Sequence, residues 1–203
     1  MKNVQPAKQV LYIGATGSLG QVVIPDLIAN TQAHFTLMAR NLDYLRLPQV
    51  DSQRYSLLPG DATNLATLVK AMQGKDLVIV AVSGSMVKIA KTVIQAMQET
   101  RVKRLIFVSS YGIYGEITGN RGINSMLMPY REAADAVELS ALDYTIMRPG
   151  WFDNSSDRSF TLFVKGEIIT GNNISRLALA TFMAQIINQP AKYNKQSVGL
   201  VRD

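Results

Sequence analysis

The sequence contains no cysteine and only one histidine, His34. A chain without thiols forms no disulfide, carries no cysteine nucleophile and holds no zinc–thiolate site. Because disulfides are rare in the cytoplasm, this composition fits a cytoplasmic protein, and we predict that location. His34 opens an apolar segment far from the motifs singled out below. We therefore interpret it as a structural or surface residue, and we predict no metal site.

Long hydrophobic segments are also missing. No run approaches the roughly 18 apolar residues that a membrane-spanning helix needs, and residues 1–6 lack the apolar core of a signal peptide. We therefore expect no membrane partner.

Acidic residues are fewer than basic ones, 15 against 21, which gives a net charge of +6. A nucleic-acid-binding protein concentrates such charge on one surface. Here it is scattered, and only Arg101, Lys103 and Arg104 form a loose group. A basic group just before a predicted strand is typical of a solvated turn, so we predict no nucleic-acid partner. The positive surplus also suits a ligand that carries phosphates.

Apolar segments with the length of buried strands alternate with helical segments along the chain. Pro25 falls inside the first predicted helix and should kink it or remove a hydrogen bond, while Asp61 or Thr63 should cap the second. The alternation predicts a mostly parallel, doubly wound α/β sheet with helices on both faces. With no repeat or linker, residues 1–203 should form a single domain. The predicted strands are 9–13, 35–39, 54–58, 77–82, 105–108, 144–147 and 197–201, and the predicted helices are 19–29, 61–72, 86–100, 130–140 and 174–188.

Three glycines, Gly14, Gly17 and Gly20, lie between the first predicted strand and the first helix. The first allows a tight turn, the second lets the backbone approach a pyrophosphate, and the third lets the helix pack on the strand. The helix N-terminus then presents free N–H groups and a partial positive charge to the phosphates. This context predicts a dinucleotide site. The residues of the loop predicted to bind the cofactor are Gly14, Thr16, Gly17, Ser18, Leu19 and Gly20.

The glycine spacing, Gly-x-x-Gly-x-x-Gly, resembles that of the extended and atypical short-chain dehydrogenase/reductases. Three further segments match this family at the expected places: Gly60–Thr63, Phe107–Ser110 and Leu142–Gly150. Together they resemble the NmrA-like group of atypical members over nearly the whole chain. The resemblance implies a Rossmann-type NAD(P)-binding domain, and the chain length is similar to that of the small flavin reductase/biliverdin reductase type.

The end of the second predicted strand indicates which dinucleotide is bound. In such folds an acidic residue there binds the ribose 2′-hydroxyl, whereas an arginine accommodates a 2′-phosphate. This strand is followed by Arg40, and no carboxylate appears before Asp43. The sequence therefore predicts NADP, with NAD as the alternative cofactor. By resemblance, Asp61 and Ala62 flank the adenine, although Asp61 is nearly as well explained as a helix cap.

Further cofactor contacts are predicted at the carboxyl ends of the later strands, where open parallel sheets bind ligands. They are Val82, Ser83, Gly84, Ser109, Pro149, Gly150 and Trp151, with Arg131 from a helix as an additional ribose contact.

The family's catalytic group is a serine together with a tyrosine and a lysine four residues apart, the cation lowering the pKa of the phenol. Ser110 matches the serine. The helix offers two registers: Arg131 in the lysine position with Leu127 in the tyrosine position, or Tyr130 with Ala134 four residues later. Neither register gives a tyrosine with a lysine. Arg131 is equally well explained by an ion pair with Asp135. We retain Ser110, Tyr130 and Arg131 as the candidate catalytic residues.

A reductase of a flavin, a quinone or another small conjugated acceptor does not need a tyrosine acid, because the cofactor supplies the chemistry. This is the function that the sequence favours. The alternatives are an NmrA-like NADP redox sensor that acts on a protein partner and, less favoured, a sugar-nucleotide epimerase or dehydratase. Residues 151–173 are predicted to form a short substrate-side lid. The oligomeric state is left open. An apolar acceptor pocket is expected from Tyr111, Tyr114, Met126, Met128, Tyr130, Trp151 and Phe152.

Overall fold

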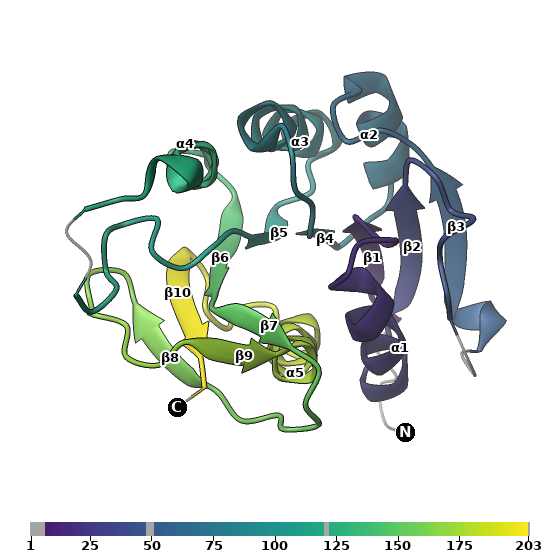
Figure 1. Cartoon of the computed structure of the whole chain (residues 1–203). Coiled ribbons are helices and arrows are strands. Elements are labelled where there is room, and N and C mark those ends of the chain that lie inside the picture. Colours follow the sequence, from purple (N-terminus) through teal and green to yellow (C-terminus); the bar gives the residue numbers. More distant parts are fainter. Residues whose placement is uncertain (1–6, 48–50, 120–121, 203) are drawn as a thin grey trace.

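The computed structural model describes residues 7–47, 51–119 and 122–202, so the predicted absence of a signal peptide at residues 1–6 concerns residues outside the description. The main sheet has eight strands in the order β3-β2-β1-β4-β5-β6-β10-β8 (Figure 1). All neighbours are parallel except β8, which is antiparallel to β10. The strands are β1 (Gln9–Ile13), β2 (His34–Ala39), β3 (Tyr55–Pro59), β4 (Leu77–Val80), β5 (Arg104–Val108), β6 (Asp143–Pro149), β8 (Thr161–Val164) and β10 (Gln196–Val201).

In the described parts of the chain, five α-helices cover the two faces of this sheet. Helices α1 (Gly20–Asn30) and α5 (Arg176–Asn188) pack together on one face, and α2 (Leu65–Met72), α3 (Met86–Thr100) and α4 (Met128–Glu138) lie on the other (Figure 1). The central strand β4 is apolar throughout because helices cover both faces of the sheet, and every one of its residues is buried. The predicted single-domain, doubly wound α/β fold is confirmed.

The predicted cap of the second helix differs from the structure. Helix α2 begins at Leu65 and is capped by Asn64, whose side chain accepts from the Thr67 N–H, rather than by Asp61 or Thr63. Asp61 instead accepts from the Thr63 N–H in the turn before the helix, at 2.8 Å. Helix α1 continues through Pro25, which has no N–H to donate within the helix, in agreement with the predicted loss of a hydrogen bond.

The predicted lid, residues 151–173, divides into two parts. Strand β7 (Trp151–Asp153) pairs in parallel with β9 (Asn173–Ser175) in a small separate sheet. Strand β8 joins the main sheet instead, where it covers the edge of β10. Residue 174, predicted as the start of the last helix, lies in β9.

The basic group before β5 is only partly a solvated turn. Arg101 is exposed, whereas Arg104 is buried at the start of the strand. Its guanidinium donates to the carbonyls of Pro190, Asp143 and Lys192 and to the Thr145 hydroxyl. Burial lowers the pKa of Arg104 to about 10, partly offset by the charge of Asp143. The prediction of a solvated turn is therefore wrong for Arg104. Its hydrogen bonds connect the chain after α5, at Pro190 and Lys192, to the sheet.

None of the helices in the described parts of the chain is long and apolar enough to cross a membrane.

Candidate functional site

A cavity of about 610 Å³ opens at the carboxyl ends of β1, β2, β4 and β5. The strand order reverses between β1 and β4, and open α/β sheets bind ligands at such a point. The volume lies within the range of small-molecule sites. The residues that line it are Ile13, Gly14, Thr16, Gly17, Ser18, Leu19, Met38, Ala39, Arg40, Gly60, Asp61, Ala62, Thr63, Ala81, Val82, Ser83, Gly84, Ser85, Lys88, Ile89, Val108, Ser109, Tyr130 and Phe152.

The three loop glycines have different steric requirements. Gly14 has a φ of +100°, and a Cβ there would lie 2.1 Å from the carbonyl oxygen of Ala81. A Cβ on Gly20 would lie 2.5 Å from the carbonyl oxygen of Ala15, so this glycine lets α1 pack on the loop. A Cβ on Gly17 would come no closer than 3.2 Å to the Gly14 carbonyl oxygen. Gly17 is thus the glycine that the fold itself needs least, as expected for one that makes room for a ligand.

The N-terminus of α1 supplies donors to the same cavity. Among the backbone hydrogen bonds of the described residues, the N–H groups of Ser18 and Leu19 have no protein acceptor, although both residues line the cavity. Ser18 and Leu19 directly precede α1, and free N–H groups at a helix N-terminus, together with the positive end of its dipole, favour an anion. The loop is therefore suited to a phosphate.

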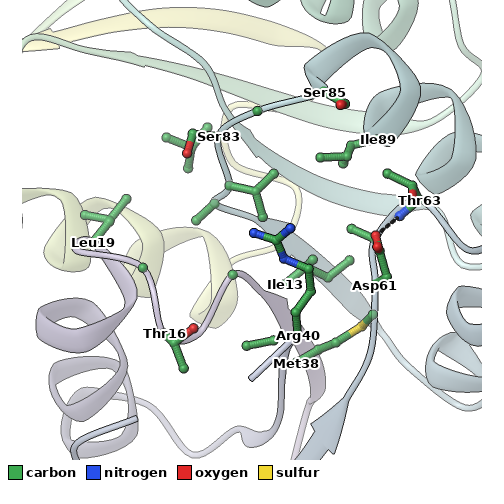
Figure 2. A pocket seen from close by; sticks show the side chains of 18 of the residues that line it. Ile13, Thr16, Leu19, Met38, Arg40, Asp61, Thr63, Ser83, Ser85 and Ile89 are labelled. Carbon is green, nitrogen blue, oxygen red and sulfur yellow. Dashed lines mark hydrogen bonds between the residues drawn. The ribbon is translucent and has the colours of Figure 1, made fainter. Parts of the chain in front are cut away.

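At one end of the cavity, here called the Arg40 end, two cations face one carboxylate. Arg40 extends into the cavity, with Thr16 and Leu19 on one side and Asp61 and Thr63 on the other (Figure 2). Lys88 lines the same cavity from the first turn of α3. The backbone and hydroxyl of Thr63 hold the pKa of Asp61 below its usual range, and the charges of Arg40 and Lys88 lower it further. This end is built to receive a negatively charged group.

The other end, here called the Tyr130 end, is formed by Val108, Ser109, Tyr130 and Phe152. The Ser109 hydroxyl donates to the Tyr130 carbonyl oxygen at 3.5 Å, which joins the end of β5 to α4. Four residues after Tyr130 stands Ala134, which is buried. Among the described residues that line the cavity, the only lysine is Lys88, at the Arg40 end. The cavity therefore contains a phenol without a lysine partner.

The structure does not bring the other two candidate catalytic residues into this cavity. The Ser110 hydroxyl donates to the carbonyl oxygen of Tyr111 at 3.3 Å. Arg131 binds Asp135 at 2.8 Å, and its guanidinium lies 4.8 Å from the centroid of the Tyr114 ring. The ion pair that the sequence offered as the alternative for Arg131 is present.

Most of the predicted cofactor contacts do line the cavity. Those that do not are Gly20, Arg131, Pro149, Gly150 and Trp151. A Cβ on Gly150 would meet the carbonyl oxygen of Asn172 at 2.3 Å, so this glycine is needed where β6 passes the chain before β9.

The expected aromatic pocket is smaller than predicted. Tyr130 and Phe152 line the cavity, but the Tyr114 hydroxyl donates to Glu138 at 2.8 Å and the Tyr111 hydroxyl to Asn172 at 2.6 Å. Burial raises the pKa of Tyr114, so this phenol is held as a neutral structural group. Met126 and Trp151 are largely exposed.

Sequence reasoning did not single out Lys88, which lines the cavity and adds a positive charge to it. Lys88 follows Ser83-Gly84-Ser85 in the first turn of the next helix. That position after a predicted ligand-binding loop was the available signal.

Comparison with known proteins shows the family to which the chain belongs. A family model described as NAD(P)H-binding matches residues 14–190. The chain belongs to this NAD(P)H-binding family. It is 34% identical to a Rossmann-fold NAD(P)-binding family protein from Shigella flexneri, with a TM-score of 0.86 and coverage of 97% of this chain and 94% of that one. The predicted kinship with the atypical short-chain dehydrogenase/reductases is confirmed.

Two more distant structures share the fold. A short-chain dehydrogenase/reductase from Veillonella parvula, solved in complex with NADP, is 24% identical with a TM-score of 0.86, covering 97% of this chain and 95% of that one. An anaerobilin reductase from Escherichia coli O157:H7 is 21% identical with a TM-score of 0.78, covering 96% and 97%. Comparison with curated protein sequences gives no match.

The residues of the cavity fit an NAD(P) cofactor. The free N–H groups of Ser18 and Leu19 suit its pyrophosphate, and Gly17 leaves the loop open to approach. The chain is thus an NAD(P)H-binding oxidoreductase of the atypical short-chain dehydrogenase/reductase kind.

Proposed function

We propose that the protein is an NADPH-dependent reductase of a small conjugated acceptor such as a flavin or a quinone. The observation that carries the proposal is the Tyr130 end of the cavity, where the phenol has no lysine partner and Ala134 occupies the position four residues later. Arg131, the one cation nearby in the sequence, is bound to Asp135. A carbonyl reductase of this family needs a phenol activated by a cation, and this site does not provide one.

The residues of the chain bind the cofactor and orient the acceptor against it. Ser18 and Leu19 offer backbone donors to the pyrophosphate, and Arg40 and Lys88 offer positive charge to a 2′-phosphate. When bound, NADPH supplies a hydride from its nicotinamide. Tyr130 and Phe152 are the aromatic residues that line that end of the cavity. A flavin or quinone delocalises the charge that it gains, so positioning it against the nicotinamide is the main task left to the protein.

The proposal is tested by following NADPH oxidation with a panel of flavins, quinones, aldehydes and anaerobilin as acceptors. Anaerobilin is included because a protein of the same fold is named as its reductase. We expect turnover with conjugated acceptors and little with simple aldehydes, which need a proton donor at the carbonyl oxygen. Turnover confined to aldehydes would contradict the proposal.

A second candidate is an NADP redox sensor with a protein partner. It is favoured by Trp151, which is 67% exposed next to the cavity residue Phe152, and by Met126, which is 79% exposed. Exposed large apolar side chains beside a ligand site are typical of interaction surfaces. Tight NADPH binding without turnover for any acceptor of the panel would favour this candidate.

A further inference from the structure

Arg148 and Glu116 form an ion pair in the interior of the protein, outside the cavity. The side chains are 0% and 4% exposed. Arg148 belongs to β6 and comes just before Pro149-Gly150, whereas Glu116 lies in the segment that follows β5. Nη1 of Arg148 donates to Oε1 of Glu116, and Nη2 donates to the carbonyl oxygens of Phe163 in β8 and Ser197 in β10, each at 3.2 Å.

Glu116 extends the same network on its other side. Its Oε2 accepts from the Tyr114 N–H at 2.7 Å, and its backbone carbonyl accepts from the Ile169 N–H at 2.7 Å. The two side chains thus join the segment after β5 to β6, β8 and β10, and the Glu116 backbone joins that segment to the chain before β9.

A third residue connects this network to α4, the helix that carries Tyr130. The Tyr114 ring lies 5.1 Å from the Arg148 guanidinium carbon, measured to the ring centroid, and its hydroxyl donates to Glu138 of α4. Lys165 donates to the other carboxylate oxygen of Glu138 at 2.6 Å. The helix is therefore held at Glu138 through the same cluster.

Stability alone is a poor explanation for this pair. Burying two charges costs free energy, and buried ion pairs can often be replaced by apolar residues without loss of stability. We expect the pair to fix the relative positions of the strands that it joins. The strand residues on either side of Arg148 bind the segment that contains the cavity residue Ser109: the Ser109 N–H donates to the Met147 carbonyl, and the Tyr111 N–H donates to the Pro149 carbonyl.

We propose that Arg148 and Glu116 are positioning residues for the acceptor side of the site. They hold the end of β5 with Ser109, and the end of β6 that leads to Phe152, at a fixed spacing. The Arg40 end and the glycine loop do not depend on them, because within the described residues none of the hydrogen bonds of the pair reaches β1, β2 or α1. This inference rests on the proposed reductase function for its kinetic consequence, but not for its structural one.

The test is the double variant Glu116→Gln/Arg148→Met, in which both charges are removed and the glutamine oxygen still accepts from the Tyr114 N–H. We expect NADPH affinity to stay within a factor of about two, while hydride transfer to a flavin in single turnover slows by roughly tenfold to a hundredfold, the cost of misplacing the acceptor by about 1 Å. Arg148→Lys, which keeps the charge but cannot make the forked contacts, should recover part of the rate. Arg101→Met, at an exposed arginine, is the matched control.

An activity-independent measurement separates this inference from the proposed function. Trp151 is the only tryptophan and lies three residues after Arg148, so its fluorescence reports on this part of the chain. With NADPH bound, acrylamide should quench Trp151 faster in the double variant than in the wild type. If no acceptor is reduced by the wild type, the reductase proposal fails, but the changed quenching still supports the positioning role.

Two results would overturn the positioning role. One is a folded double variant with unchanged quenching and an unchanged rate. The other is a parallel loss of NADPH affinity, which would mean that the pair supports the whole domain. If the double variant does not fold, Arg148→Lys alone is measured in the same way, and unchanged quenching in that variant would count against the inference.

Discussion

Arg40 and Lys88 come from different elements, the end of β2 and the first turn of α3, and face the same end of one cavity across from Asp61. Neither side chain donates a hydrogen bond or forms an ion pair within the described residues. Other arginines in the structure, such as Arg46, Arg54 and Arg104, are engaged with carbonyl groups. Two cations without a direct partner in a ligand cavity are best explained by an anionic ligand group.

Arg40→Ala and Lys88→Ala should therefore weaken the binding of NADPH more than the binding of NADH. Each substitution removes a positive charge that would attract the 2′-phosphate. For Arg40 we expect a loss of binding free energy on the order of 1.5–3 kcal/mol, or roughly tenfold to a hundredfold in affinity. Lys88, a flexible point charge, should contribute less. Calorimetric titration of both cofactors checks this. Lys91→Ala, at an exposed lysine of α3 that does not line the cavity, is the control, and equal losses for both cofactors would show that the phosphate is not the group bound.

Gly17→Val should lose cofactor affinity, whereas Gly20→Ala should lose stability. The Gly17 variant should fold, because its Cβ would come no closer than 3.2 Å to a neighbour, yet lose NADPH affinity by roughly a hundredfold or more. The Gly20 variant should lose about 1–3 kcal/mol of stability, because its Cβ would lie 2.5 Å from a backbone oxygen. Urea unfolding and NADPH titration of both proteins separate the two effects. A Gly17 variant that is folded and binds normally would disprove the assigned role.

Tyr130→Phe should change the rate of hydride transfer to a flavin or quinone by only a small factor. The phenol has no lysine neighbour to make it an effective proton donor, so the substitution removes a hydroxyl and little else. Ser110→Ala should also have a small effect, since its hydroxyl donates to the Tyr111 carbonyl and lies off the cavity. Single-turnover rates across pH are the measurement. A drop of about a thousandfold in Tyr130→Phe, beyond the lower range for acid–base catalysis, would mean that this tyrosine is the acid after all.

Arg104→Met should destabilise the protein without changing cofactor affinity. The substitution leaves the carbonyls of Pro190, Asp143 and Lys192 without their donor, and we expect the free energy of unfolding to fall by about 2–4 kcal/mol. Denaturant unfolding measures it. The exposed neighbour Arg101 provides the comparison, since Arg101→Met should remain within about 0.5 kcal/mol of wild type. Equal effects at both positions would contradict the burial argument.

Local sequence patterns predicted most of the fold and the cofactor side of the site. Gly14 and Gly17 lie in the turn between β1 and α1, and Gly20 is the first residue of α1, so the spacing of the three glycines reflects the local geometry of this turn. Arg40 was found for the same reason, because it directly follows a strand whose end position is fixed by the sheet. The start of α2 at the Asn64 cap was missed. Several polar residues in this part of the sequence can serve as a helix cap, and the sequence alone does not say which of them does.

The sequence by itself determined the parallel sheet and the glycine loop, because strand burial and turn geometry act between residues that are close along the chain. Only the tertiary structure decided what surrounds the Tyr130 end. Whether Arg131 faces a ligand or Asp135, and whether Tyr114 enters the pocket or binds Glu138, depends on packing between α4, β6, β8 and β10. The burial of Arg148 against Glu116 likewise joins residues 32 positions apart, which no spacing rule connects. Such contacts form where distant elements meet, and the energy of burying a charge there depends on every group that surrounds it.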